Sequence, residues 1–153
     1  MAGFDFTLGL SGEVGALTML TLLTEELADM TVVWPSVRDA LRLQMAAEFA
    51  AEGPGWAPLS EDYKMWKDLN FPGPILQLTG ALLDSLTGGN EGDEIYEPSP
   101  MGMRWGTKIP YAWTLQHGDA DINLPAREIL SVEALSPTIM GVLTASTVWM
   151  EAM

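Results

Sequence analysis

Apolar residues recur along this chain at two different spacings, and the change of spacing separates a helical part from an extended part. Up to about residue 90, apolar positions return every three or four residues, which is typical of helices with one buried face. From Ile95 onward they return every second residue, which is typical of strands. Helices followed by strands and a last helix predict an α+β fold with an antiparallel sheet.

The first half of the chain predicts a short strand and two long helices. Phe4, Phe6 and Leu8 alternate with polar residues, and a helix is expected from about Glu13 to Met30. A second helix begins at the Trp34-Pro35-Ser36 break and ends at Gly53-Pro54-Gly55. The stretch from 56 to 74 is expected to be irregular, apart from a turn or two around residues 60–67.

The second half predicts short elements. They are a helix from about Thr79 to Leu86, a hairpin of Ile95–Glu97 and Met101–Thr107, a short strand at Ile122–Leu124, and a last helix from Ser136-Pro137 to about Met150. The complete expectation is a single domain over residues 1–153. Its antiparallel sheet has about four strands, packed by two long N-terminal helices, a short middle helix and a C-terminal helix.

The charge of the chain restricts its binding partners. The formal net charge is −14, with only seven Lys and Arg, which argues against specific binding to nucleic acid or to an anionic membrane surface. The mean hydropathy of +0.14 is high for such an acidic chain, so part of the apolar surface is expected to cover a partner. The apolar run Val14–Leu23 is too short to cross a bilayer and no signal peptide is evident, so we expect a cytoplasmic protein.

Few residues offer catalytic or metal-binding chemistry. The chain has no cysteine and one histidine, His117, which alternates with Asp119 and Asp121. On a strand these three side chains would face one way as a metal site, but a polar loop is the ordinary alternative because Gly118 and Ala120 disfavour a strand. No serine sits in a nucleophile motif and no phosphate-binding glycine loop follows a strand. We therefore expect no enzyme activity, no metal and no cofactor.

Two further features have ordinary explanations. The acidic stretch Asn90–Glu94 lacks the ligand spacing of a calcium loop and is expected to be solvated. Six Trp and ten Met are abundant for a chain of this length. Core packing and interface anchoring are equally good interpretations of these side chains.

Three segments resemble the phage virion morphogenesis family, also called tail completion proteins. The first is Gly55-Trp56-Ala57-Pro58-Leu59-Ser60, with Tyr63 and Trp66-Lys67 after it. The second is the stretch Ile75–Thr87, which is similar to the family pattern I-L-x-L-T-G-x-L-x-x-S-L-T. The third is Pro110-Tyr111-Ala112 leading to Gly118, then Leu124–Leu130. The resemblance spans about half of the chain, from Gly53 to Leu130.

The third segment departs from the family pattern at three positions. Leu115 stands where the family usually has histidine, and Glu128 and Ile129 stand where Pro and Phe are common. These departures concern a polar contact at that turn and leave the implied fold unchanged.

The resemblance implies a set of structural and interface residues. A short helix that Thr79 caps would bury one side through Leu78, Leu82, Leu83 and Leu86. Tyr111, Pro125 and Arg127 would fix a long connection against the sheet, with Arg127 paired to a carboxylate or to backbone carbonyls. The candidates are Trp56, Leu78, Thr79, Gly80, Leu82, Leu86, Tyr111, Ala112, Gly118, Pro125 and Arg127.

The function implied is that of a subunit that closes the head-proximal end of a virus tail and joins it to the head. Such proteins act as rings, commonly hexameric, and the partners are then further copies of the chain, a tail tube protein and a head-closure or connector protein. DNA would pass through an acidic lumen without specific binding. A neck or connector protein of the same region, a cellular acidic binding module and a metal-dependent enzyme based on His117 are the alternatives.

Overall fold

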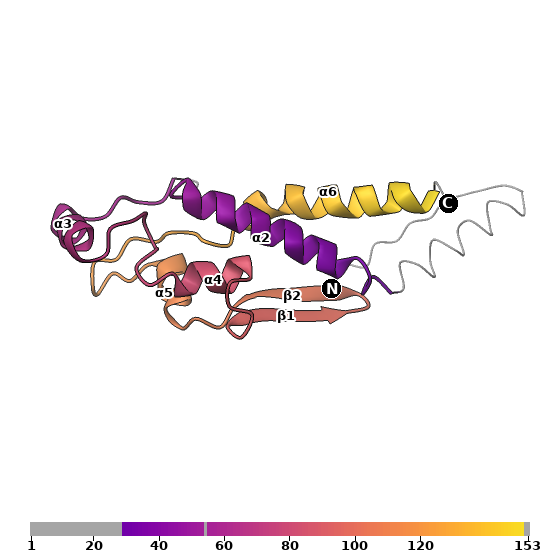
Figure 1. Ribbon diagram of the computed structural model, residues 1–153, viewed down its shortest axis with the longest axis horizontal. Helices are drawn as coiled ribbons and strands as arrows, with labels where there is room; N and C mark the ends of the chain where they lie inside the picture. The colour runs from indigo at the N-terminus through magenta and orange to yellow at the C-terminus, as the bar shows by residue number, and fades with distance from the viewer. Residues whose placement is uncertain (1–28, 54, 152–153) are drawn as a thin grey trace, which may run out of the picture.

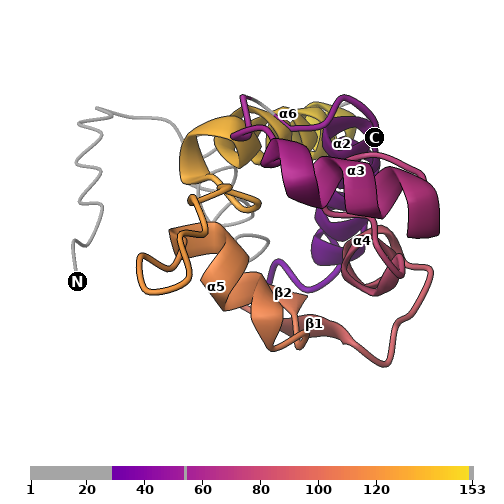
Figure 2. The same ribbon diagram turned by 90° about the vertical axis from the view of Figure 1, so that its left-hand side faces the viewer.

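The computed structural model describes residues 29–53 and 55–151, which form five helices and one two-stranded sheet. The helices are α2 (Trp34–Ala50), α3 (Glu61–Asn70), α4 (Ala81–Thr87), α5 (Tyr111–His117) and α6 (Val132–Glu151), and the strands are β1 (Glu94–Ser99) and β2 (Gly102–Thr107). Helices α2 and α6 lie side by side along the long axis, with α3 at one end (Figure 1). In the end-on view the hairpin lies on the side opposite α6, with α4 and α5 on its two flanks (Figure 2).

Helix α2 is the central element because one stripe of its surface is apolar. Val37, Leu41, Met45 and Phe49 recur every four residues and are all at most 2% exposed. Pro35 occupies the first turn, where its missing N–H leaves no bond unmade. The helix predicted from the Trp34-Pro35-Ser36 break is therefore confirmed.

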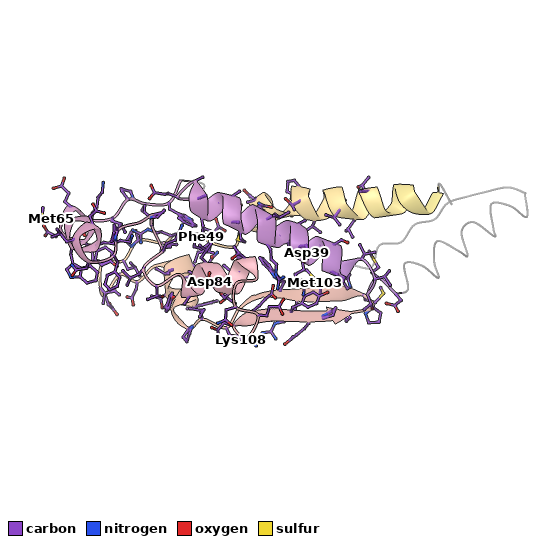
Figure 3. All side chains as sticks on the ribbon, in the orientation of Figure 1. Asp39, Phe49, Met65, Asp84, Met103 and Lys108 are labelled. Carbon is purple, nitrogen blue, oxygen red and sulfur yellow. The ribbon has the colours of Figure 1, made fainter. Side chains whose placement is uncertain are left out.

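The α2 stripe joins two apolar clusters. Near its C-terminal end, Met45 and Phe49 pack with Trp56, Leu82, Leu86 and Ile129. Near its N-terminal end, Trp34, Val37 and Leu41 pack against half-buried side chains of the hairpin and α6. Phe49, labelled in Figure 3, lies inside the molecule between α2 and α4.

The tryptophans divide between core and surface. Trp56 packs edge-on against Phe49 at 5.2 Å between ring centroids, and its indole N–H donates to the Glu128 carbonyl at 2.8 Å. Trp34 is buried as well and donates to the Ser99 carbonyl at 2.7 Å. Trp66 and Trp113 are 45% and 71% exposed. Core packing is thus the correct interpretation for the first pair, and the second pair is available to a partner.

A buried ion pair fastens the hairpin to α2. Glu94, at the start of β1, is 5% exposed and accepts hydrogen bonds from Arg42 Nε at 2.9 Å and Trp105 Nε1 at 2.8 Å. Arg42 Nη2 contacts the second oxygen of the same carboxylate. Burial by itself would raise the pKa of Glu94, but the hydrogen bonds from Arg42 and Trp105 and the nearby positive charges lower it.

The expected sheet of about four strands is wrong. Within the described residues, the only sheet is the predicted hairpin, in which Tyr96 pairs with Trp105 and Ser99 with Gly102. Ile122–Leu124 is no strand, because Asn123 has a φ of +53° and the stretch makes only an isolated bridge between Asp119 and Leu124. The strand expected at residues 4–8, and the helix expected at residues 13–30 as far as residue 28, lie outside the described residues.

The helix boundaries also differ from the prediction. Ser136-Pro137 was expected to open the last helix, but α6 begins at Val132 and carries Pro137 in its second turn. α3 is a full helix where only a turn or two was predicted, and α5 was not predicted. Among the described helices, none combines the length and apolarity needed to cross a bilayer.

Removing the charge of Glu94 should destabilise the fold more than removing that of a neighbour on the same strand. Glu94→Gln removes the buried carboxylate from the half-buried Arg42 and leaves it only the exposed partners Asp39 and Glu91, so we expect the free energy of unfolding to fall by about 2 kcal/mol. Glu97 is the matched control because its pair with Arg104 is exposed on both sides, and Glu97→Gln should cost less than about 1 kcal/mol. Urea denaturation of both variants measures the difference, and equal losses would contradict the role of the pair.

The same pair should make stability depend on pH. Because the pKa of Glu94 is lower in the folded chain than in the unfolded chain, its contribution is complete above the unfolded pKa. The contribution disappears as pH falls through the folded pKa, so the difference in stability between the wild type and Glu94→Gln should shrink below about pH 4. Thermal melts of both proteins over a pH series test this, and a difference that stays constant down to pH 3 would exclude it.

Candidate functional site

A groove of about 630 Å³ lies between α3 and α5. One wall is the end of the first motif segment together with Tyr63 and Lys67 of α3. The opposite wall is α5 with the loop that follows it, and the stretch 76–80 closes the side between them. Leu76 has a φ of +60°, an uncommon conformation for a branched side chain, at the bend that brings this stretch to the groove.

The three segments of the resemblance meet at this groove. Six of the candidate residues line it, although the second and third segments are separate in sequence: Leu78, Thr79, Gly80, Tyr111, Pro125 and Arg127. Trp56, Leu82 and Leu86 are instead buried in the core beneath, and Ala112 is half-buried against that core. The resemblance therefore marks one surface and the packing that supports it.

Arg127 ties the third segment to the first. It is 3% exposed, and its guanidinium donates to the carbonyls of Ala57 at 2.9 Å and Pro58 at 3.2 Å. Its backbone N–H donates to the Leu115 carbonyl at 2.8 Å. Of the two kinds of partner expected for Arg127, the structure has backbone carbonyls, and among the described residues it makes no ion pair. Burial lowers the pKa of Arg127, and nearby Tyr63 opposes this in part.

Lys67 is a second buried cation on the groove. It is 2% exposed, and its Nζ donates to the Phe71 carbonyl at 3.3 Å and to the Gly73 carbonyl. These contacts cover the C-terminal end of α3, where a positive charge is favourable. Within the described part of the chain, Lys67 has no carboxylate partner. It belongs to the quoted Trp66-Lys67 motif, but sequence reasoning did not select it.

The groove differs in charge from the rest of the molecule. The chain has 21 Asp and Glu, yet none of the residues that line the groove is acidic. Two of the seven Lys and Arg lie there, and most of the other lining side chains are apolar. The groove is therefore a positive, apolar surface on a strongly acidic protein.

The loop after α5 is held by one glycine and one amide. Gly118 has a φ of +74°, and a Cβ there would lie 2.7 Å from the Ala126 amide nitrogen, so only glycine fits. The Gln116 side chain accepts from the amides of Ile129 and Leu130 at 2.7 and 3.0 Å. Gln116 was not predicted, because a single glutamine in a helix gives no pattern that indicates such a bond.

Two expectations for the second segment are wrong. Thr79 is not the N-cap of the short helix: α4 begins at Ala81, Gly80 precedes it in the left-handed conformation, and the Thr79 hydroxyl accepts only a long 3.4 Å bond from the Ala81 amide. Leu78 is not on the buried side of that helix but 39% exposed at the groove. The left-handed Gly80 turns the chain before α4, which separates Leu78 from the stripe of Leu82 and Leu86.

His117 ends α5 and does not lie on a strand. Its ring packs on the exposed Trp113 at 3.9 Å between centroids, and its Nδ1 is 3.0 Å from the Trp113 carbonyl oxygen. Asp119 accepts a bond from the Asp121 amide within the loop. No group of three or more potential metal ligands occurs among the described residues.

The outer face of α3 adjoins the groove. This helix buries a charged side chain and exposes apolar ones, which is the reverse of an ordinary surface helix. Its buried side chain is Lys67, whereas Met65 and Leu69 are 67% and 80% exposed. Tyr63 stacks on Trp66 at 5.5 Å between centroids, and Trp66 contacts Phe71 at 5.8 Å. Met65 lies at the outer end of the molecule in Figure 3. We call Tyr63, Met65, Trp66, Leu69 and Phe71 the α3 face.

Comparisons of the chain with protein-family models, curated proteins and solved structures found no match. The three motif segments thus carry the resemblance to tail completion proteins by themselves. The groove at which they meet is the candidate functional site.

Replacing Arg127 should loosen the groove. Arg127→Ala removes the donors to the carbonyls of Ala57 and Pro58, so we expect the free energy of unfolding to fall by about 2–4 kcal/mol. Arg104→Ala is the control because Arg104 makes an exposed pair, and it should cost less than about 1 kcal/mol. Chemical denaturation of both variants tests this, and equal small effects would show that Arg127 does not anchor the segments.

Proposed function

We propose that this chain is a structural subunit of a tailed virus particle. In this proposal it is a tail completion or terminator protein that forms a ring at the head–tail junction, around the DNA channel. The observation that supports the proposal most is the α3 face, where five large apolar side chains are exposed beside the groove of the three motifs. An exposed apolar patch of this kind is typical of a surface that a partner covers.

The arrangement of the elements suits head-to-tail association. Helix α3 lies at one end of the molecule, and the hairpin turn lies toward the other end (Figure 1). The first described residues lie beside that turn, because the Met30 amide donates to the Pro100 carbonyl. Contacts between two different ends of identical subunits are heterologous, and they form a closed ring when the rotation between subunits closes.

The charges of the chain are compatible with a channel through which DNA passes without being bound. Arg38, Arg42 and Arg104 are paired with acidic side chains, and Lys67 and Arg127 are buried. The described residues therefore present few free cations for phosphate groups, while the net charge of −14 repels DNA. DNA would slide through such a ring without a specific contact.

The proposed partners follow from this place in the particle. The ring would contact the tail tube protein on one side and a head-closure or connector protein on the other, in the virion and, during assembly, in the host cytoplasm. A neck or connector protein of the same region is the alternative within this class. Binding to the tail tube separates the two, since only the terminator contacts it.

A charge on the α3 face should prevent ring formation. Leu69→Lys places a cation in the apolar face, so assembly should weaken at least tenfold, whereas Leu43→Lys alters an equally exposed leucine of α2 and should have no effect. Native mass spectrometry of the full chain, alone and with the tail tube protein, measures the ring. A wild-type protein that stays monomeric in both samples would contradict the proposed function, and a ring unaffected by Leu69→Lys would exclude the α3 face.

A further inference from the structure

We propose that the groove between α3 and α5 binds an acidic, apolar segment of a second copy of this chain, the stretch Phe4-Asp5-Phe6. The Asp5 carboxylate would pair with Lys67 and Arg127, and the two phenylalanines would cover the apolar walls. This assignment rests on the proposed ring for its second copy, but binding of the segment can be measured separately.

Two buried cations, Lys67 and Arg127, lie at the groove. A buried ammonium or guanidinium is costly unless an anion accompanies it, yet Lys67 and Arg127 are bonded only to backbone carbonyls among the described residues. Arg127 uses Nε and Nη2 for these bonds, and its Nη1 has no acceptor among the residues that the structure describes. Because none of the residues that line the groove is acidic, a carboxylate that pairs with these cations has to come from outside the groove.

The walls define what must surround that carboxylate. Leucines, prolines and tyrosines make up half of the residues that line the groove, including Leu59, Tyr63, Leu76, Tyr111, Leu124 and Pro125. A ligand that fills it therefore needs apolar side chains on both sides of one negative charge. A small anion such as phosphate would satisfy the cations and leave these walls uncovered.

Residues 1–28 contain both the acidic and the apolar side chains that such a ligand needs. They include four acidic residues, Asp5, Glu13, Glu25 and Glu26, and contain no Lys, Arg or His. Phe4-Asp5-Phe6 is the place where one carboxylate is flanked directly by aromatic residues. Such a segment is complementary to the groove in both charge and hydrophobicity.

The proposed ring supplies a neighbouring copy as the source of the segment. Met30 is bonded to the hairpin turn at Pro100, while the groove is lined by α3, which lies at the opposite end of α2 (Figure 1). The residues between Phe6 and Asp29 would reach roughly 70 Å when extended, against a length of roughly 25 Å for α2, so the segment is long enough for the groove of its own subunit or of a neighbour. In a head-to-tail ring the hairpin end of one subunit meets the α3 end of the next, so the segment arrives beside the neighbouring groove.

The test uses a fluorescent peptide of residues 1–12, titrated into the full-length protein at a concentration where it is monomeric. We expect saturable binding that weakens at least tenfold when the peptide carries Asp5→Asn, a change that cannot unfold the protein. Lys67→Met in the protein should weaken binding by a similar factor, and Lys64→Met, an exposed lysine of the same helix, should not. Absence of binding, or equal binding by both peptides, would overturn the assignment.

A second measurement identifies the source of the segment in the assembled protein. A photo-reactive amino acid at Ile122, an exposed residue on the groove rim, is cross-linked in a mixture of isotope-labelled and unlabelled chains. Cross-links from residue 122 to residues 1–12 of the other isotope support the assignment, and a ring whose cross-links reach only other segments overturns it. A protein that binds the peptide but forms no ring would refute the proposed function and leave the groove assignment standing.

Discussion

Four apolar side chains, spaced every four residues along α2, hold this helix against α4, the hairpin and α6. Met45 and Phe49 pack against α4 and Trp56, and Val37 and Leu41 pack against the hairpin and α6. From the same helix, Arg42 reaches the buried Glu94 at the start of β1. The short hairpin would be marginal alone, and α4 has only seven residues, so both depend on this helix for their stability.

The burial of α2 also accounts for the exposed character of α3. The core is completed by Trp56 and by the leucines of α4, and α3 stands at the end of the molecule beyond this core. Its apolar side chains therefore face outward, while Lys67 turns inward to the carbonyls at the end of the helix. An arrangement that leaves large apolar side chains in water and buries cations costs stability in a monomer. It becomes favourable where a partner covers the apolar side chains and supplies a carboxylate.

The sequence predicts those parts of the fold in which apolar periodicity and burial coincide. The stripe of α2 and the alternation around Trp105 indicated their elements correctly, because these residues pack in the two apolar clusters that α2 joins. Helix α5 has no buried residue, so its sequence shows no apolar stripe. The apolar residues Ile122 and Leu124 line the groove and do not pack in a sheet. A short run of apolar residues does not distinguish these cases.

The sequence indicated some of the residues of the candidate site, but it did not indicate the buried cations or the contacts between segments that form the site. Six of the candidate residues taken from the motif segments line the groove, although the order of the segments along the chain does not show that they meet. The burial of Lys67 depends on the bend at Gly73, whose carbonyl it contacts, and the bonds of Gln116 depend on the return of the chain at Ile129. These are contacts between segments that no local pattern contains.

In the proposed ring, the α3 face and the groove form the contact between neighbouring subunits. A cryo-electron microscopy reconstruction of the full-length protein assembled on tail tubes tests this directly. The account predicts a closed ring in which α3 and the groove of each subunit are covered by the next copy, with an additional segment beside Lys67 and Arg127. A ring that leaves the α3 face and the groove open to solvent would contradict it.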